Sequence, residues 1–162
     1  MQRTRHVDTT VAGFATSAFW IGMTLGRYTL GSISDKFGVH RSVAMYIAIS
    51  IGLQIGLNVL SQTTITLLLI GINGFFLAPV FPSGIIVLVS RTEPRNQIAV
   101  VAVAIAFGQI GAAVAPLGIG FMASSVGIGY LLEVILGLTV AMLSVWVWFS
   151  VRTHNAVAER CA

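Results

Sequence analysis

Five long apolar stretches, separated by short polar segments, constrain this chain more than any other feature of its sequence. They cover roughly residues 10–33, 42–60, 64–90, 97–123 and 127–151. Each is long enough for a helix to cross a hydrocarbon core of about 30 Å, which takes ~18–20 residues. Only helices and closed barrels satisfy their own backbone hydrogen bonds in lipid, and the sequence lacks the alternating pattern of barrel strands. We therefore predict an all-α membrane protein with about five transmembrane helices.

Composition excludes the soluble classes of protein. Of the 162 residues, 56% are hydrophobic and only 9% are charged, whereas a soluble domain carries about 25% charged residues. So few charges cannot cover a water-soluble enzyme, and so apolar a chain is not a disordered segment. The one cysteine, Cys161, excludes an internal disulfide framework. Residues 1–162 are interpreted as a single transmembrane bundle without a linker or a soluble domain.

The distribution of lysine and arginine predicts the orientation of the bundle. One side collects Lys36, Arg41, Arg91, Arg95, Arg152 and Arg160, and the other side holds only Arg3 and Arg5. The positive-inside rule then places the Asp35–Arg41 loop, the Arg91–Gln97 loop and the C-terminus in the cytoplasm. The basic residues stand in short clusters between apolar runs, so they do not indicate a nucleic-acid partner. The expected surroundings are the lipid bilayer.

The loop between the first two apolar stretches has a distinctive pattern. It reads Gly-Ser-Ile-Ser-Asp-Lys-Phe-Gly-Val-His-Arg over residues 31–41. Gly38 supplies the backbone freedom that a tight turn needs. Asp35 is placed to accept hydrogen bonds from a helix N-terminus or to pair with a base such as Arg27 or Arg41. On charge alone, a cytoplasmic loop with a turn glycine remains the simpler interpretation.

The spacing of these residues resembles the conserved loop motif of the major facilitator superfamily. That motif has a glycine, an Asp four residues later, a base, a glycine and a basic end, and Val39 and His40 depart from it at the basic end. In the family, the Asp latches one helix pair to a neighbouring helix when the carrier faces outward. The resemblance implies a conformational latch made by Arg27, Gly31, Asp35, Lys36, Gly38 and Arg41.

Three further stretches resemble the C-terminal half of that family. Gly22–Arg27 resembles helix eight, Gly74–Pro82 resembles helix ten of the fucose-permease-like branch, and Phe107–Pro116 resembles helix eleven. The resemblance implies helices eight to twelve, a partial major-facilitator-type bundle. Family members have about twelve helices in two halves, with the substrate held between the halves. We therefore expect a fragment of a twelve-helix carrier whose N-terminal helices are its partner.

Polar and aromatic residues within the apolar stretches indicate a solute pathway. The candidate substrate-binding residues are Trp20, Thr24, Asn73, Phe76 and Gln109. An indole ring can stack on a sugar ring, and amides both donate to and accept from hydroxyl groups. Hydrogen bonding between helices is the alternative role for each of them. That alternative is preferred for Gln54 and Asn58, which the resemblance places on a peripheral helix.

Small residues and prolines in the apolar stretches predict where helices touch and bend. Gly22/Gly26 and Gly52/Gly56 are pairs that allow close helix approach. Pro79, Pro82 and Pro116 are expected to kink their helices, and Pro94 suits a first helical turn. Glu133 is the one acid within a stretch. We expect it to snorkel to the surface or to be paired, with proton coupling as the alternative.

No pattern in the sequence points to an enzyme, a metal site or a cofactor. His6, His40 and His154 lie in separate hydrophilic segments, and no glycine-rich phosphate-binding loop is present. The leading hypothesis is a secondary active transporter for a small polar solute, with sugars among the candidates. The alternative is a non-transporting membrane subunit that packs against or regulates a partner.

Overall fold

The computed structural model contains long helices joined by short turns. It describes residues 9–60, 62–125 and 130–158, and their side chains except those of Thr9, Asp35, 122–125 and 152–158. The elements are α1 (Thr9–Phe37), α2 (Val39–Val59), α3 (Thr63–Leu77), α4 (Val80–Ser90), the short 3-10 helix η1 (Pro94–Asn96), α5 (Gln97–Ser125) and α6 (Leu131–Ala158). The described residues form no strand, so the prediction of an all-α fold is confirmed.

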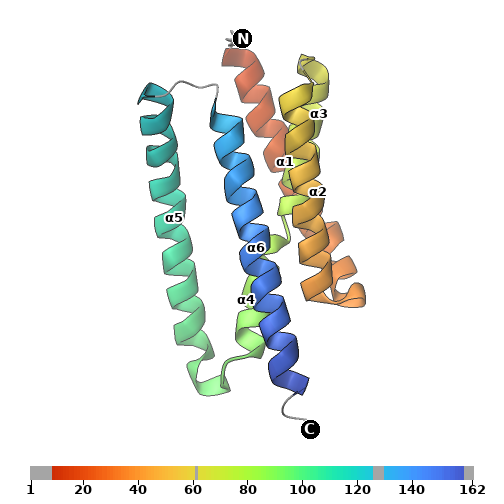
Figure 1. The fold of residues 1–162 in the computed structure, drawn as a ribbon, viewed down its shortest axis with the longest axis vertical. Helices are drawn as coiled ribbons and strands as arrows, with labels where there is room; N and C mark the ends of the chain where they lie inside the picture. The colour runs from red at the N-terminus through yellow and green to blue at the C-terminus, as the bar shows by residue number, and fades with distance from the viewer. Residues whose placement is uncertain (1–8, 61, 126–129, 159–162) are drawn as a thin grey trace.

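Four of the five predicted spans are confirmed as helices that can cross a membrane. Within the described residues, the segments long and apolar enough are Val39–Val59, Thr63–Ser90, Pro94–Phe121 and Leu131–Val151. The remaining stretch forms α1, whose 29 residues include Arg27 and Lys36 together with several Ser and Thr residues. These polar residues make α1 less apolar than its neighbours. It nevertheless runs alongside α3 over much of its length (Figure 1).

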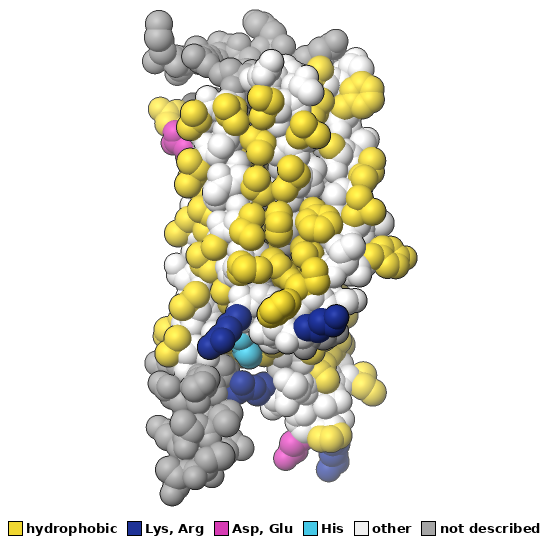
Figure 2. Space-filling model, turned by 90° about the vertical axis from the view of Figure 1, so that its right-hand side faces the viewer, with side chains coloured by type: hydrophobic (Ala, Val, Ile, Leu, Met, Phe, Trp, Pro, Cys, Tyr) yellow, Lys and Arg dark blue, Asp and Glu magenta, His cyan; other side chains and the backbone are white. Residues whose placement is uncertain are grey.

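The turns gather at the two ends of the bundle (Figure 1). The α1–α2 turn, the α4–α5 turn and the C-terminal part of α6 lie toward the lower end of the view, and the N-terminus and the α2–α3 turn lie at the upper end. Basic side chains on the face shown in Figure 2 gather below a broad apolar band. The turns that the positive-inside rule groups together are therefore at one end of the molecule.

The most extensive contact between helices joins α1 to α3, and glycine makes it possible. A Cβ atom at Gly22 would collide with the Gly71 carbonyl, one at Gly26 with the Phe75 carbonyl, and one at Gly74 with the Phe19 carbonyl. The two backbones are thus in direct contact, as small residues permit in membrane helices. The predicted role of Gly22 and Gly26 is confirmed.

The second predicted glycine pair does not mark a close approach of two helix backbones. A Cβ at Gly52 would meet nothing within 4 Å, and one at Gly56 would meet only Leu69 Cδ1 at 3.7 Å. The prediction of close approach at Gly52 and Gly56 is therefore wrong. The spacing of two glycines shows where backbones can approach, whereas the partner helix decides where they do.

Proline interrupts one predicted span and leaves another continuous. The stretch predicted over 64–90 is divided into α3 and α4 at Ala78–Pro79. Pro82 lies inside α4, and Pro116 lies inside the uninterrupted α5. Pro94 opens η1, ahead of α5, as expected for a first helical turn. The break before α4 lets the lower part of this span contact both α2 and α5.

The Gly31–Arg41 segment is more helical than the sequence pattern indicated. α1 continues to Phe37 and α2 begins at Val39, so Gly38 alone separates the two helices. Gly38 has a φ of 90°, and it is the glycine with a positive φ in the described chain. A side chain at this φ would be strained, so the predicted role of Gly38 in the turn is confirmed.

The buried core is centred on α2. Val43, Tyr46, Ile47 and Leu57 of this helix are buried, and α3, α4 and α6 pack around it. In contrast, none of the most apolar stretch of α5 is buried within the chain. An apolar helix that other helices leave uncovered needs lipid or further protein around it. This exposure agrees with a membrane protein.

We expect Gly26→Ala to destabilise the chain because its methyl group would meet the Phe75 carbonyl. Overpacking of this kind costs about 1–3 kcal/mol. Gly52→Ala is the matched control, since its Cβ enters open space and alanine favours a helix by up to about 1 kcal/mol over glycine. The measurement is the midpoint of unfolding by denaturing detergent in micelles. Equal midpoints for the two variants would contradict the α1–α3 contact.

Candidate functional site

A chain of buried polar side chains crosses the bundle interior. The Ser50 hydroxyl of α2 donates to Asn73 Oδ1 of α3 at 2.8 Å, and Gln54 Nε2 of α2 donates to Thr139 Oγ1 of α6 at 3.0 Å. Gln54 Nε2 also lies 3.4 Å from Ser50 Oγ, which joins the two contacts. The Thr139 hydroxyl in turn donates to the Ile135 carbonyl at 2.8 Å. These four side chains, called here the polar chain, connect three helices.

Burial makes the polar chain energetically important. All four side chains are buried, with Gln54 only 4% exposed. Buried polar groups destabilise a protein unless they are hydrogen-bonded, and the penalty grows in an apolar interior. Gln54 Oε1 is buried and has no partner among the described residues. Its amide is held by the donated bonds alone, since both neighbouring hydroxyls already donate elsewhere.

Two further polar contacts bind the lower part of the bundle together. The Tyr46 hydroxyl donates to the Leu30 carbonyl at 3.4 Å and lies 3.4 Å from Ser34 Oγ, which joins α2 to α1. Trp146 Nε1 of α6 donates to the His40 carbonyl at the start of α2 at 3.1 Å. α2 is therefore hydrogen-bonded to α1, α3 and α6.

The candidate residues of α1 lie on an exposed face. Trp20 is 57% exposed, and its ring meets only Phe19 edge-on among the described aromatic rings. The Thr24 hydroxyl is also exposed and donates to the Trp20 carbonyl at 2.9 Å. The Thr24 oxygen can still accept a hydrogen bond from a ligand. The Trp20–Thr24 face of α1 therefore presents one flat ring and one hydroxyl to its surroundings.

The candidate residues of α3 face the interior of the chain. Asn73 is buried and belongs to the polar chain. Phe76 is half-buried between the rings of Tyr46 and Phe75, with centroid distances of 6.2 and 5.5 Å. The structure thus separates Asn73 and Phe76 from the exposed face of Trp20. It joins Asn73 to Gln54 through Ser50, so the hydrogen bonding between helices that was preferred for Gln54 is confirmed. The Asn58 amide instead donates to the Gln54 carbonyl of its own helix at 3.3 Å.

Gln109 lies on a different surface again. It is exposed midway along α5, a helix that contacts mainly α4 and η1. The described structure gives its amide no hydrogen bond, although it stands among apolar neighbours such as Phe107 and Ile110. In Figure 1, α5 lies at the left of the view, apart from α1. Trp20, Asn73 and Gln109 therefore do not meet in one site within this chain.

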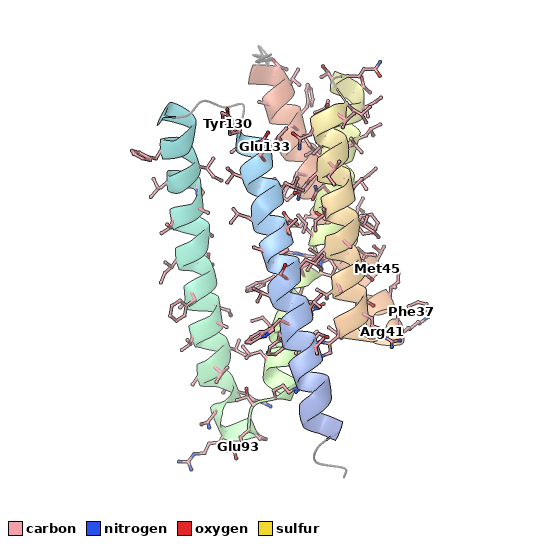
Figure 3. The ribbon with its side chains drawn as sticks, viewed as in Figure 1. Phe37, Arg41, Met45, Glu93, Tyr130 and Glu133 are labelled. Atoms are coloured by element: carbon pink, nitrogen blue, oxygen red, sulfur yellow. The ribbon has the colours of Figure 1, made fainter. Side chains whose placement is uncertain are left out.

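The predicted latch residues gather around the α1–α2 turn. Lys36 and Arg41 are exposed there, Gly31 is half-buried, and the Asp35 side chain lies outside the described part of the structure. Figure 3 shows Phe37 and Arg41 at this turn, and Glu93 further down at the α4–α5 turn. Glu133 is exposed in the first turn of α6, at the opposite end. Its position agrees with the expectation of a surface glutamate.

Sequence reasoning overlooked the residues that complete the polar chain. Ser50 and Thr139 are small hydroxyl residues, which membrane helices usually satisfy with their own carbonyls. The available signal was the spacing of Tyr46, Ser50 and Gln54, which follow one another at intervals of four and share one face of a helix. A row of polar residues on one face of an apolar helix indicates a neighbouring helix whose polar groups hydrogen-bond to that face.

The fold and these contacts agree with the comparison to protein families. A family model described as Major Facilitator Superfamily matches residues 1–160. The chain belongs to the major facilitator superfamily. As a superfamily member whose described residues include four membrane-capable helices, it is an integral, multi-pass membrane protein of a transporter family.

A curated yeast protein shows a more distant similarity. "Bypass of stop codon protein 6" of Saccharomyces cerevisiae is 25% identical over 138 residues, which cover 79% of this chain and 28% of the yeast protein. The chain thus spans less than a third of that relative's length. No solved structure matches the chain.

We expect the Gln54–Thr139 contact to stabilise the packing of α2 on α6. Gln54→Leu and Thr139→Val each remove it, and hydrogen bonds between membrane helices contribute about 0.5–1.7 kcal/mol. A double-mutant cycle, measured by detergent unfolding, should give a coupling in this range. Gln62→Leu, an exposed amide ahead of α3, is the control and should change stability little. Additive effects of Gln54→Leu and Thr139→Val would contradict the contact.

Proposed function

We propose that this chain forms part of a secondary active transporter that moves a small polar solute. Membership of the superfamily supports the proposal, since the family match runs over residues 1–160. The chain spans only 28% of its yeast relative, so the complete transport cycle is proposed for a carrier with further helices. In such carriers the solute site lies between two helical halves near the membrane midplane.

The observation that carries the proposal is the exposed amide of Gln109. It lies at the middle of a 29-residue helix, among side chains that are exposed and apolar. An amide facing lipid at this depth is costly, because nothing there replaces its hydrogen bonds to water. A water-filled cavity beside α5 removes that cost. We infer that the Gln109 face of α5 lines the solute pathway.

Trp20 and Thr24 offer a second surface to the solute on α1, which does not meet the Gln109 face within this chain. Their exposed ring and hydroxyl suit a solute with one apolar face and several hydroxyl groups, a sugar among them. Asn73 and Phe76 act behind this surface in the proposal, by holding α3 against α2 through Ser50 and Tyr46. The proposed partner is the set of helices that closes the cavity.

We also propose that the α1–α2 turn is a cytoplasmic conformational latch. The support is the sharp turn at Gly38 and the exposed bases Lys36 and Arg41 beside it. Asp35 would pair with a neighbouring helix when the carrier faces outward. The orientation follows from the positive-inside rule. Cys161 lies outside the described residues, and this orientation places it in the cytoplasm. Labelling of Cys161 by an impermeant maleimide in sealed, right-side-out cells would contradict the orientation.

The transport proposal is tested with the longest in-frame gene product in proteoliposomes. Uptake of labelled glucose, myo-inositol and glycerol is measured against empty vesicles. For a transported solute, we expect Gln109→Ala to reduce kcat/KM by about 10- to 100-fold, because a lost hydrogen bond leaves solute groups unpaired. Gln62→Ala is the control amide and should leave uptake unchanged. Equal uptake by wild type and Gln109→Ala, at equal protein yield, would contradict the role of Gln109.

A further inference from the structure

A small pocket lies where α1 and α4 meet the start of α2. Its volume is about 130 Å³. Residues of all three helices line it, and those that matter below are Arg27, Gly31, Ser34, Val39, Ser83 and Ile86. None of them belongs to the proposed solute surface of Trp20, Thr24 and Gln109. The pocket is therefore separate from that surface, although Arg27 and Gly31 are also among the latch residues predicted from the sequence.

The pocket exists because the backbone on two sides of it is unusual. The α3–α4 break at Ala78–Pro79 displaces α4, and Pro79 and Pro82 lie in its wall. On the opposite wall, a Cβ at Gly31 would meet nothing within 4 Å. The absence of a side chain at Gly31 thus leaves the space open. A compact ligand can enter without displacing a packed residue.

Ser83 provides a hydrogen-bonding group with no partner. The residue is only 5% exposed, and it lines the pocket. No hydrogen bond joins its hydroxyl to any other described residue, whereas the Ser34 hydroxyl donates to the Leu30 carbonyl at 2.9 Å. A hydroxyl in the wall of a pocket, with no described hydrogen bond of its own, is available to a ligand as a donor and an acceptor. Ser83 can donate to such a ligand.

Arg27 provides a positive charge at the same pocket. Its guanidinium makes one described polar contact, from Nη2 to Met23 Sδ at 3.8 Å. No acidic side chain that the structure describes lies within ion-pair distance of it. Arg27 is ten residues before the end of α1 at Phe37, or about 15 Å along the helix. Arg27 is exposed, so its guanidinium can pair with an anion that enters the pocket.

We propose that this pocket binds a compact carboxylate with a small apolar body. The carboxylate would accept hydrogen bonds from the Arg27 guanidinium and the Ser83 hydroxyl, a charge-assisted arrangement. Val39 and Ile86 would contact the apolar body. A cavity of about 150 Å³ holds a benzene-sized molecule, so 130 Å³ suits a ligand such as butyrate.

The test uses the purified 162-residue chain in phosphatidylcholine nanodiscs, with butyrate as the probe. Butyrate and its neutral analogue butyramide are compared by saturation-transfer NMR, with empty nanodiscs subtracted. We expect binding of butyrate and at least about tenfold weaker binding of butyramide, because the neutral amide forfeits the charge-assisted bond. Because binding is measured without transport, its failure is distinguishable from failure of the transport proposal.

Variants show whether butyrate occupies this pocket. Arg27→Gln should weaken butyrate binding at least about tenfold, and Ser83→Ala should weaken it to a smaller extent. Arg27→Lys keeps the positive charge and should retain much of the binding. This variant distinguishes loss of the charge from loss of the fold as the cause of weaker binding. Arg95→Gln removes an exposed arginine outside the pocket and should change nothing. Equal binding of butyrate and butyramide, or butyrate binding that is unaffected by Arg27→Gln, would overturn the proposal.

Discussion

Direct backbone contact between α1 and α3 is the interaction on which the rest of the structure depends. Gly22 and Gly26 lie against the carbonyls of Gly71 and Phe75. The Phe75 carbonyl is one that a regular helix would pair with the N–H of residue 79, and Pro79 has no N–H to give. The glycine of α1 therefore covers a carbonyl that the proline of α3–α4 leaves open. Glycine lets the two backbones touch. Proline ends α3 just below this contact, and the displaced α4 forms a wall of the pocket.

α2 connects this pair to the rest of the chain through polar contacts instead of glycine. Its side chains reach α1 through Tyr46, α3 through Ser50 and α6 through Gln54. In lipid there is no hydrophobic force between helices, so packing and hydrogen bonds decide which helices stay together. α5 takes no part in these bonds and leaves its apolar surface uncovered. A tightly bonded group of helices beside a loosely held helix suits a carrier in which bundles rock against each other.

The sequence predicted the helices well and the site only in part, for physical reasons. Apolar length and proline position depend on local chemistry, so the spans and the α3–α4 break could be expected. Which face of a helix packs against a neighbour depends on the neighbouring helix. The residue pattern of one helix does not show which helix that neighbour is. This is why Gly22 and Gly26 make a close contact while Gly52 and Gly56 do not. It is also why Asn73 pairs with Ser50 inside the chain, while Gln109, another amide within an apolar helix, faces outward.

Solid-state NMR on proteoliposomes measures the α1–α3 contact most directly. With ¹³C at glycine Cα and at phenylalanine carbonyls, through-space cross-peaks report glycines that lie against phenylalanine carbonyls. Besides the peaks from sequence neighbours, a cross-peak between Gly26 and Phe75 is expected, because the two are in direct contact. It should vanish in Gly26→Ala and persist in Gly52→Ala. Identical glycine–phenylalanine cross-peaks in the wild type and both variants would contradict the contact and the packing built on it.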